Sequence, residues 1–405
     1  MKRFAILVVL AVLAASIPAP AALCEEKSPA YSFKFSGYFK GDVVYDQARA
    51  NSGDYALFLL NQPKNAVTSM TARETRLGFD FSWKENEWQT DARLEFDFYG
   101  LGVTAATLNS QENKGTTMLR HAYAQVTRGH WSLLAGQTSD IISPLVPKSV
   151  NYTVLWDQGN IGYRRPQLRV TGWVNASDKV KVTAALGATR TLGGDLDGDK
   201  IDDGADAVLP TAQGRLGIAA KLGEKKTLEV GFSGHYGREQ YVLNFSTQYV
   251  KSWSANVDLR AVIGDRFELL AEGFTGQDLG TYFGGVGQTV NPLNHEIASM
   301  GAWGQISFKP IERVWINLGY GWDDPKDEDF EIPATATTDV SFLDFNSDVF
   351  GSIFCNVTST VTAMIEVSGL KTEYILKHFV GGEIVGTDIN RNEVRVQFAI
   401  KAAIK

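Results

Sequence analysis

The sequence predicts an all-β fold, a transmembrane antiparallel β-barrel of about 16 strands. Three observations lead to this prediction. From Phe33 onward, apolar and polar residues alternate in stretches of about 10 to 14 residues, which is the period of a strand with two unlike faces. Short and long polar connections alternate between these stretches. Of the 405 residues, 44% are hydrophobic, yet beyond the first twenty-odd no apolar run approaches the roughly 18 to 20 residues of a membrane-spanning helix.

The first segment has the three regions of a secretory signal. Lys2 and Arg3 form a basic start, residues 4–15 are almost unbroken apolar, and residues 18–24 are mostly small and break a helix. We expect residues 1–24 to be removed as a signal peptide. Residues 25–405 should then form one barrel domain, because no change in composition divides them. Lipid attachment at a cysteine ending the signal is an alternative that the large residue before that cysteine disfavours.

The strand pattern extends over the whole mature chain. Residues 77–83 (LGFDFSW) and 94–98 (LEFDF) show the alternation near the start, and residues 228–232 (LEVGF) and 394–400 (VRVQFAI) repeat it later. Successive side chains of a strand point to opposite faces, so each segment has one apolar face and one polar face. A barrel in lipid needs this arrangement.

The connections alternate in length. The short turns are 84–87, 128–130, 175–178, 223–226, 264–266, 310–312 and 358–360. The long polar loops are 47–70, 101–116, 139–159, 191–210, 238–248, 279–295, 324–346 and 377–390. Seven short and eight long connections join sixteen strands, which is the layout of a bacterial outer-membrane barrel with short periplasmic turns and long extracellular loops. A soluble sandwich, a propeller or a solenoid would not require an export signal and this alternation together.

Several segments carry a family resemblance. Residues 119–125 (LRHAYAQ), 133–138 (LLAGQT) and 159–167 (GNIGYRRPQ), with 36–38 (SGY) and 74–79 (ETRLGF), resemble the trimeric porins of Gram-negative outer membranes, and the DcaP-like porin family in particular. The resemblance implies a homotrimeric, sixteen-stranded passive channel whose third long loop, 139–159, folds into the pore. The chain departs from the family's usual pattern at its two ends. Only a few residues precede the first strand, and the chain does not end on an aromatic residue.

Strand parity places a set of charged residues in the lumen if the apolar faces contact lipid. The pore-lining candidates are Arg76, Asp80, Asp91, Arg93, Glu95, Asp97, Arg165, Arg169, Lys181 and Arg215. Later strands add Glu229, Asp258, Arg260, Glu268, Glu272, Glu366, Arg395 and Lys401. Acidic and basic sectors facing each other would set a transverse field, with Arg165 and Arg169 as the wall that attracts anions. The alternative is that these charges pair with their neighbours and only keep the lumen hydrated.

One loop contains a regular series of aspartates. Asp195, Asp197, Asp199, Asp203 and Asp206 occupy positions 1, 3, 5, 9 and 12 of a segment similar to the calcium loops of thrombospondin type 3 repeats. We therefore expect a possible Ca²⁺ site in residues 195–206. Lys200 stands where such loops have a glycine, and a solvated acidic loop without metal is the alternative.

Other classes of function are disfavoured. A net charge of -7 argues against nucleic acid as a partner, because such binding needs a basic face. The five histidines are not accompanied by a Gly-x-Ser-x-Gly elbow, so we predict no enzymatic activity and no required cofactor. The expected partners are outer-membrane lipid and small hydrophilic solutes that diffuse passively, and the family resemblance favours anionic ones. The expected location is the outer membrane of a Gram-negative bacterium. A non-conducting structural or adhesive barrel is the alternative.

Overall fold

The computed structural model describes residues 30–51, 54–100, 115–243, 245–380 and 383–404. The predicted signal peptide, 1–24, and most of the predicted long loop 101–116 therefore lie outside the described residues. In these ranges, helix is limited to one short α-helix and three 3-10 turns, α2 (Asp203–Asp206), η3 (Gly280–Tyr282), η4 (Gly285–Gly287) and η5 (Asp327–Asp329). Within the described ranges, no helix combines the length and the apolar character that crossing a membrane would require.

Strands make up most of the chain. They are β1 (Ala30–Asp46), β2 (Val67–Thr71), β3 (Arg76–Glu85), β4 (Trp88–Gly100), β5 (Thr116–Arg128), β6 (Trp131–Ser139), β7 (Arg164–Asn175), β8 (Val180–Thr189), β9 (Thr211–Gly223), β10 (Lys226–Leu243), β11 (Ser246–Ile263), β12 (Phe267–Gln277), β13 (Ala298–Ile311), β14 (Val314–Pro325), β15 (Val340–Asn356), β16 (Val361–Val380) and β17 (Glu383–Ile404). All neighbouring strands are antiparallel, and β1 pairs with β17 from Gly37↔Ile404 to Asp46↔Arg395, which closes the sheet into a barrel.

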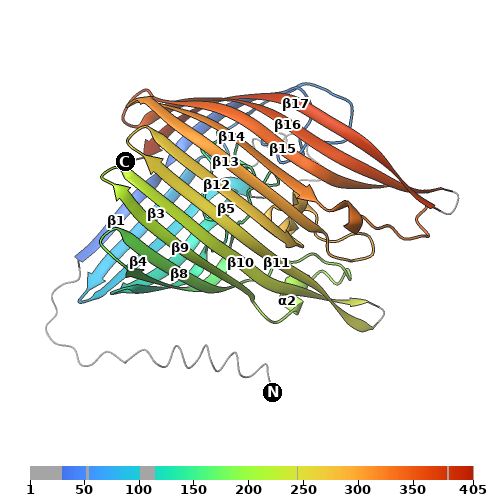
Figure 1. Ribbon diagram of the computed structural model, residues 1–405, viewed down its shortest axis with the longest axis horizontal. Helices are drawn as coiled ribbons and strands as arrows, with labels where there is room; N and C mark the ends of the chain where they lie inside the picture. Colours follow the sequence, from blue (N-terminus) through green and yellow to red (C-terminus); the bar gives the residue numbers. More distant parts are fainter. Residues whose placement is uncertain (1–29, 52–53, 101–114, 244, 381–382, 405) are drawn as a thin grey trace, which may run out of the picture.

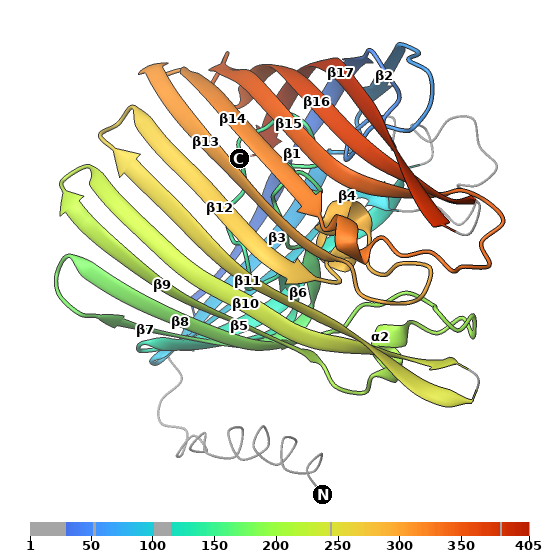
Figure 2. The same cartoon turned by 45° about the vertical axis from the view of Figure 1, so that its right-hand side comes forward.

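The barrel has the predicted sixteen strands, because β2 and β3 together act as one. β3 pairs with the first half of β1, and β2 pairs with the last residues of β1. The seventeen strands of the sheet therefore occupy sixteen strand positions in the barrel wall. The break between β2 and β3 is bridged by Thr75, whose hydroxyl accepts a hydrogen bond from Lys40 N at 3.2 Å. Figures 1 and 2 show the tilted strands, with the short turns at one end and the long hairpins at the other.

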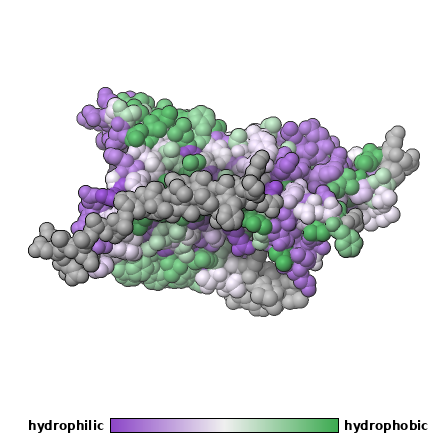
Figure 3. All heavy atoms as spheres, turned by 90° about the horizontal axis from the view of Figure 1, so that it is seen from below, coloured by the Kyte–Doolittle hydropathy of each residue, from purple (hydrophilic) through white to green (hydrophobic). Residues whose placement is uncertain are grey.

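Large apolar side chains face outward around the barrel. Phe39, Val43, Phe232, Leu318 and Phe398 are among them, and each alternates with an inward residue. In Figure 3 the hydrophobic atoms on the visible face gather between a hydrophilic rim and the hydrophilic loop end. A closed barrel with an apolar outer belt satisfies every backbone group of the wall and can span a bilayer.

The short turns fall where the sequence predicted them, but two predicted long loops are wrong. Predicted loop 238–248 is a tall hairpin in which Leu243 pairs with Ser246, and predicted loop 377–390 is a hairpin in which Val380 pairs with Glu383. Both hairpins extend beyond the apolar belt. A strand that is surrounded by water can be polar on both faces. In these two hairpins, the alternation of apolar and polar residues therefore stops where the strands leave the lipid, although the strands themselves continue.

Candidate pore

The loop between β6 and β7, residues 140–163, lies inside the barrel, as predicted. Its backbone is held by inward-facing side chains of five strands spread around the barrel. The bonds are Ile141 N to Gln213 Oε1 of β9 at 2.8 Å, Leu145 N to Glu272 Oε1 of β12 at 2.8 Å, Lys148 N to Gln305 Oε1 of β13 at 2.6 Å, Val150 N to Glu366 Oε2 of β16 at 2.6 Å, and Lys40 Nζ of β1 to Val150 O at 3.0 Å. The loop therefore crosses the lumen along the inner wall and narrows it.

Two glycines allow this loop to touch the wall. The φ of Gly159 is +105°, and a Cβ there would collide with the carbonyl of Ala302 in β13. A Cβ on Gly321 of β14 would collide with the carbonyl of Gln158. The backbone of the loop therefore lies directly against the backbone of β13 and β14, and only glycine, which has no Cβ, allows so close an approach.

Two further loops fold inward over the first. In the described part of loop 47–66, Leu57 O accepts hydrogen bonds from Gln158 Nε2 at 2.9 Å and from Asn346 Nδ2 at 2.7 Å. In loop 278–297, Phe283 O accepts from Asp157 N at 2.9 Å. The buried Asp157 carboxyl lies beside Asp323 of β14, and burial with this like charge raises its pKa well above the ordinary value.

Part of the space that remains lies beside the early strands of the barrel, and it is called the passage below. A cavity of about 370 Å³ lies between loop 140–163 and the wall formed by β1, the β2–β3 connection, β3 and β5. The loop contributes Ile142, Pro144 and Leu145 together with polar residues, whereas the wall contributes the charged side chains Glu74, Arg76 and Arg120. The wall side of the passage therefore carries two guanidinium groups and one carboxylate, which pairs with Lys40.

Arg120 reaches this passage through a β-bulge. Glu95 of β4 pairs with His121 of β5 and the next residue, Phe96, pairs with Leu119, so Arg120 is an extra residue in the ladder. Its guanidinium contacts Glu95 at 3.0 Å and Asp97 at 2.6 Å. Simple alternation cannot place both Arg120 and His121 at the lumen, so this arginine is absent from the pore-lining residues predicted from the sequence.

The ten sequence-predicted residues alternate along their strands with residues of the outer apolar face, and whether each of them lines the conducting path stays a prediction. Their cross-strand pairs are Asp80↔Arg93, Asp91↔Ser82, Leu134↔Arg169, Thr138↔Arg165, Asn175↔Lys181 and Ser233↔Arg215, with Arg76↔Tyr38, Glu95↔His121 and Asp97↔Met118. Many of these charges pair locally. Arg93 contacts Asp80 at 2.8 Å and also Glu95, and Arg215 contacts Asp258 at 2.6 Å. The acidic sector therefore contains its own arginines, and two opposed sectors of single sign are not formed.

Arg165 is not part of an exposed wall, in contrast to the prediction. Its side chain is 1% exposed beneath loop 140–163. Nε lies 3.0 Å from Asp140 Oδ1, Nη2 donates to Thr281 O at 3.1 Å, and Cζ lies 3.8 Å from the centre of the Tyr282 ring. Strand periodicity does not reveal these partners, because two loops that fold inward provide them. Arg169 on the same strand is only partly buried, and has no ion pair among the described residues.

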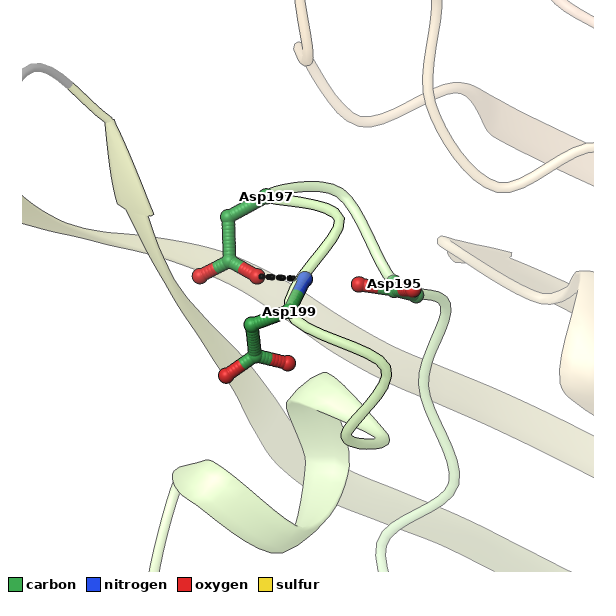
Figure 4. Close-up of side chains that lie close together, drawn as sticks. All are labelled: Asp195, Asp197 and Asp199. Atoms are coloured by element: carbon green, nitrogen blue, oxygen red, sulfur yellow. Dashed lines mark hydrogen bonds between the residues drawn. The ribbon is translucent and has the colours of Figure 1, made fainter.

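The acidic loop brings together three of its five aspartates. Carboxylate oxygens of Asp195, Asp197 and Asp199 lie within 4.8 Å of one another. Figure 4 shows Asp197 and Asp199 side by side with Asp195 across the turn. Asp203 accepts a hydrogen bond from Leu196 N at 2.8 Å and, with Asp206, belongs to α2. Lys200 adopts a φ of 73°, the left-handed conformation for which a glycine is usual.

This cluster offers the hard oxygen donors that Ca²⁺ prefers, so calcium binding remains a prediction for the three grouped aspartates. Burial and the neighbouring Asp197 and Asp195 raise the pKa of Asp203, which indicates a negative potential at the loop. We expect calorimetry to detect Ca²⁺ binding with a Kd of about 10⁻⁴ to 10⁻³ M. The double variant Asp195→Asn, Asp197→Asn should abolish the heat, whereas Asp265→Asn at a short turn should not. The absence of heat with the unaltered chain would reject the site.

No family model matches the sequence, and no curated protein matches it. Solved structures do match. The outer membrane channel DcaP of Acinetobacter baumannii gives a TM-score of 0.69 at 17% identity, covering 95% of this chain and 100% of that chain. The anion-selective porin from Comamonas acidovorans gives 0.54 at 12% identity, with 93% and 100% covered. OmpT, an outer membrane protein of Vibrio cholerae in its trimer form, gives 0.55 at 9% identity, with 93% and 100% covered.

These likenesses agree with the geometry. The closed barrel, its apolar belt and the loop inside its lumen were established without reference to other proteins, and the matching chains are covered over their full length. The outer-membrane setting predicted from the sequence is consistent with such neighbours. At these identities the similarity concerns the fold, and the resemblance to DcaP-like porins is confirmed at that level: the chain has the barrel fold of the outer-membrane porins.

Proposed function

We propose that this protein is an outer-membrane porin through which small hydrophilic solutes diffuse down their gradients, with a preference for anions. It acts as a channel and not as an enzyme. The passage between loop 140–163 and the arginine-bearing wall is the selective region. The loop limits the size of the solutes that pass, and the charges on the wall select the sign of the solute charge.

One observation carries the anion preference: on the wall of the passage, the most exposed charged side chain is an arginine. The side chain of Arg76 is 23% exposed, whereas the carboxylates of Glu74 and Glu95 are 15% and 6% exposed and pair with Lys40 and Arg120. A solute in the passage therefore meets this guanidinium group more readily than it meets the acids. Arg93 and Asp80, outside the lining of the passage, are equally exposed and pair with each other. Fixed cations at the surface of a narrow passage lower the energy of an anion there more than that of a cation.

We also propose a homotrimer. Three outward alanines lie beside one another on adjacent strands, because Ala92 pairs with Ala124 and Ala124 pairs with Ala135. Such a smooth patch allows close approach of a second barrel wall. The trimer form named for the Vibrio cholerae neighbour supports the same arrangement.

The test is the reversal potential of the purified barrel in a planar bilayer under a KCl gradient. We expect a potential of the sign given by anion preference, and closure in three steps if the channel is trimeric. The double variant Arg76→Gln, Arg93→Gln should shift the potential towards cation preference, because it leaves Asp80 and Glu95 without these partners.

The matched control removes two arginines outside the passage. Arg128 contacts Glu87 at 2.8 Å on the short-turn rim, and Arg313 is exposed in the turn between β13 and β14. Arg128→Gln, Arg313→Gln should leave the potential unchanged. A folded barrel that conducts no current would favour the structural or adhesive alternative, and a cation-selective channel would contradict the anion preference.

A further inference from the structure

A second recess lies on the inner wall near the short-turn end, away from the passage beside loop 140–163. It has a volume of about 530 Å³ and is lined by residues of β7 to β11 and of the turn between β7 and β8. Ala219 of β9 pairs with Lys181 of β8, so the inward position next to this lysine carries only a methyl group. This small side chain leaves room for the recess.

Three lysines surround this recess. Lys181 and Lys221 are on inward positions of β8 and β9, and Lys221 N donates to Lys179 O at 2.8 Å, which brings the third lysine next to them. All three are exposed, and none of them forms an ion pair within the described ranges of the chain. The ammonium of Lys181 lies 5.3 Å from the centre of the Trp173 ring, which holds it at the edge of the recess.

The nearby carboxylates have other partners. Glu229 lines the recess but contacts Arg215 at 3.3 Å, and Arg260 at the opposite edge contacts Glu268 at 2.8 Å. Asp178 is the one lining acid without an ion pair among the described residues. The recess therefore keeps a positive excess, and hydroxyl and amide groups of Asn175, Ser177 and Thr227 add neutral hydrogen-bonding capacity.

We propose that this recess is a second anion-binding site, at the mouth on the short-turn side, for small oxyanions that carry more than one negative charge. Several ammonium groups around one hollow favour a multivalent anion over a monovalent one, since each contact adds to the attraction. The inference rests on the proposed channel function. Binding at the mouth would make the channel respond differently to an anion presented from its two sides.

Citrate is the probe, added to one compartment of a planar bilayer at a time. We expect citrate on the short-turn side to reduce the KCl current, and citrate on the loop side to act more weakly. Lys181→Gln, Lys221→Gln should weaken the short-turn block about tenfold, because two of the ammonium groups are removed. Ala219→Leu, which fills the recess without changing its charge, should weaken it as well.

The control removes two lysines from the same rim outside the recess. Lys225 contacts Asp265 and Lys309 contacts Glu312 at 2.6 Å, so Lys225→Gln, Lys309→Gln should change the block less than twofold. Equal weakening by both double variants, or unchanged block in the recess variants, would overturn the site. Failure of the proposed anion preference is recognised separately, because it appears as a cation-selective reversal potential without citrate.

Discussion

Replacing Arg165 with alanine is expected to destabilise the inward loops by about 3 to 5 kcal/mol, because it leaves the buried carboxylate of Asp140 without its cation. Asp140 is 1% exposed, and its oxygens also accept hydrogen bonds from Tyr163 N and Gln213 Nε2 at 2.8 Å each. The variant also loses the bond to Thr281 O and the stacking on Tyr282, so loops 140–163 and 278–297 should loosen together.

Limited proteolysis of the folded barrel and the noise of the open-channel current would measure this loosening. Arg169→Ala is the control on the same strand face, because Arg169 is partly exposed, donates to Gln167 and Ser139, and forms no ion pair with the residues that the structure describes. The double variant Asp140→Asn, Arg165→Met should recover much of the loss, since no unpaired charge stays buried. An Arg165→Ala barrel with protease resistance and noise like those of the unaltered protein would show that Arg165 does not hold the loops.

Local pattern was sufficient to predict the wall of the barrel. The alternation at residues 77–83 fixed which side chains of β3 face lipid, and the register Asp80↔Arg93 agrees with the parity assigned to β4. The short turns and the number of strands followed from the same alternation. A strand with one face towards lipid and one towards water carries both environments as an alternation in its own sequence.

The interior could not be predicted in the same way, because its contacts join distant parts of the chain. Leu59 N bonds Thr372 Oγ1 at 2.9 Å across 313 residues, and no local period reveals such a pair. The burial of Arg165 depends on two loops that cover it, and the position of Arg120 depends on a bulge. Sequence parity identifies which charges face inward, whereas loop packing decides which of them a solute can reach.

Loop packing also leads to the other large expected effect, an increase in conductance when Glu366 is replaced by alanine. Glu366 on β16 is 2% exposed and accepts three hydrogen bonds from the tip of loop 140–163. The donors are Val150 N at 2.6 Å, Asn151 N at 3.2 Å and Ser149 Oγ at 2.9 Å. Without the carboxylate, the buried Val150 N–H loses its acceptor at a cost of about 1 to 3 kcal/mol, whereas Asn151 N keeps its bond to Ser149 Oγ at 3.0 Å.

A loss at the upper end of this range, about 3 kcal/mol, shifts the balance between docked and undocked loop tip by about a hundredfold, since each 1.4 kcal/mol is a factor of ten. An undocked tip leaves part of the lumen cross-section open, so single-channel conductance in KCl should rise and its noise should increase.

Glu366→Gln keeps one acceptor oxygen and should have an intermediate conductance, which separates loop release from misfolding. Glu393→Ala removes a buried carboxylate that instead accepts from Ala48 N at 2.8 Å in loop 47–66, and should leave the tip in place. Conductance that is unchanged in a folded Glu366→Ala barrel would mean that the other anchors along β9 to β1 hold the tip without this carboxylate.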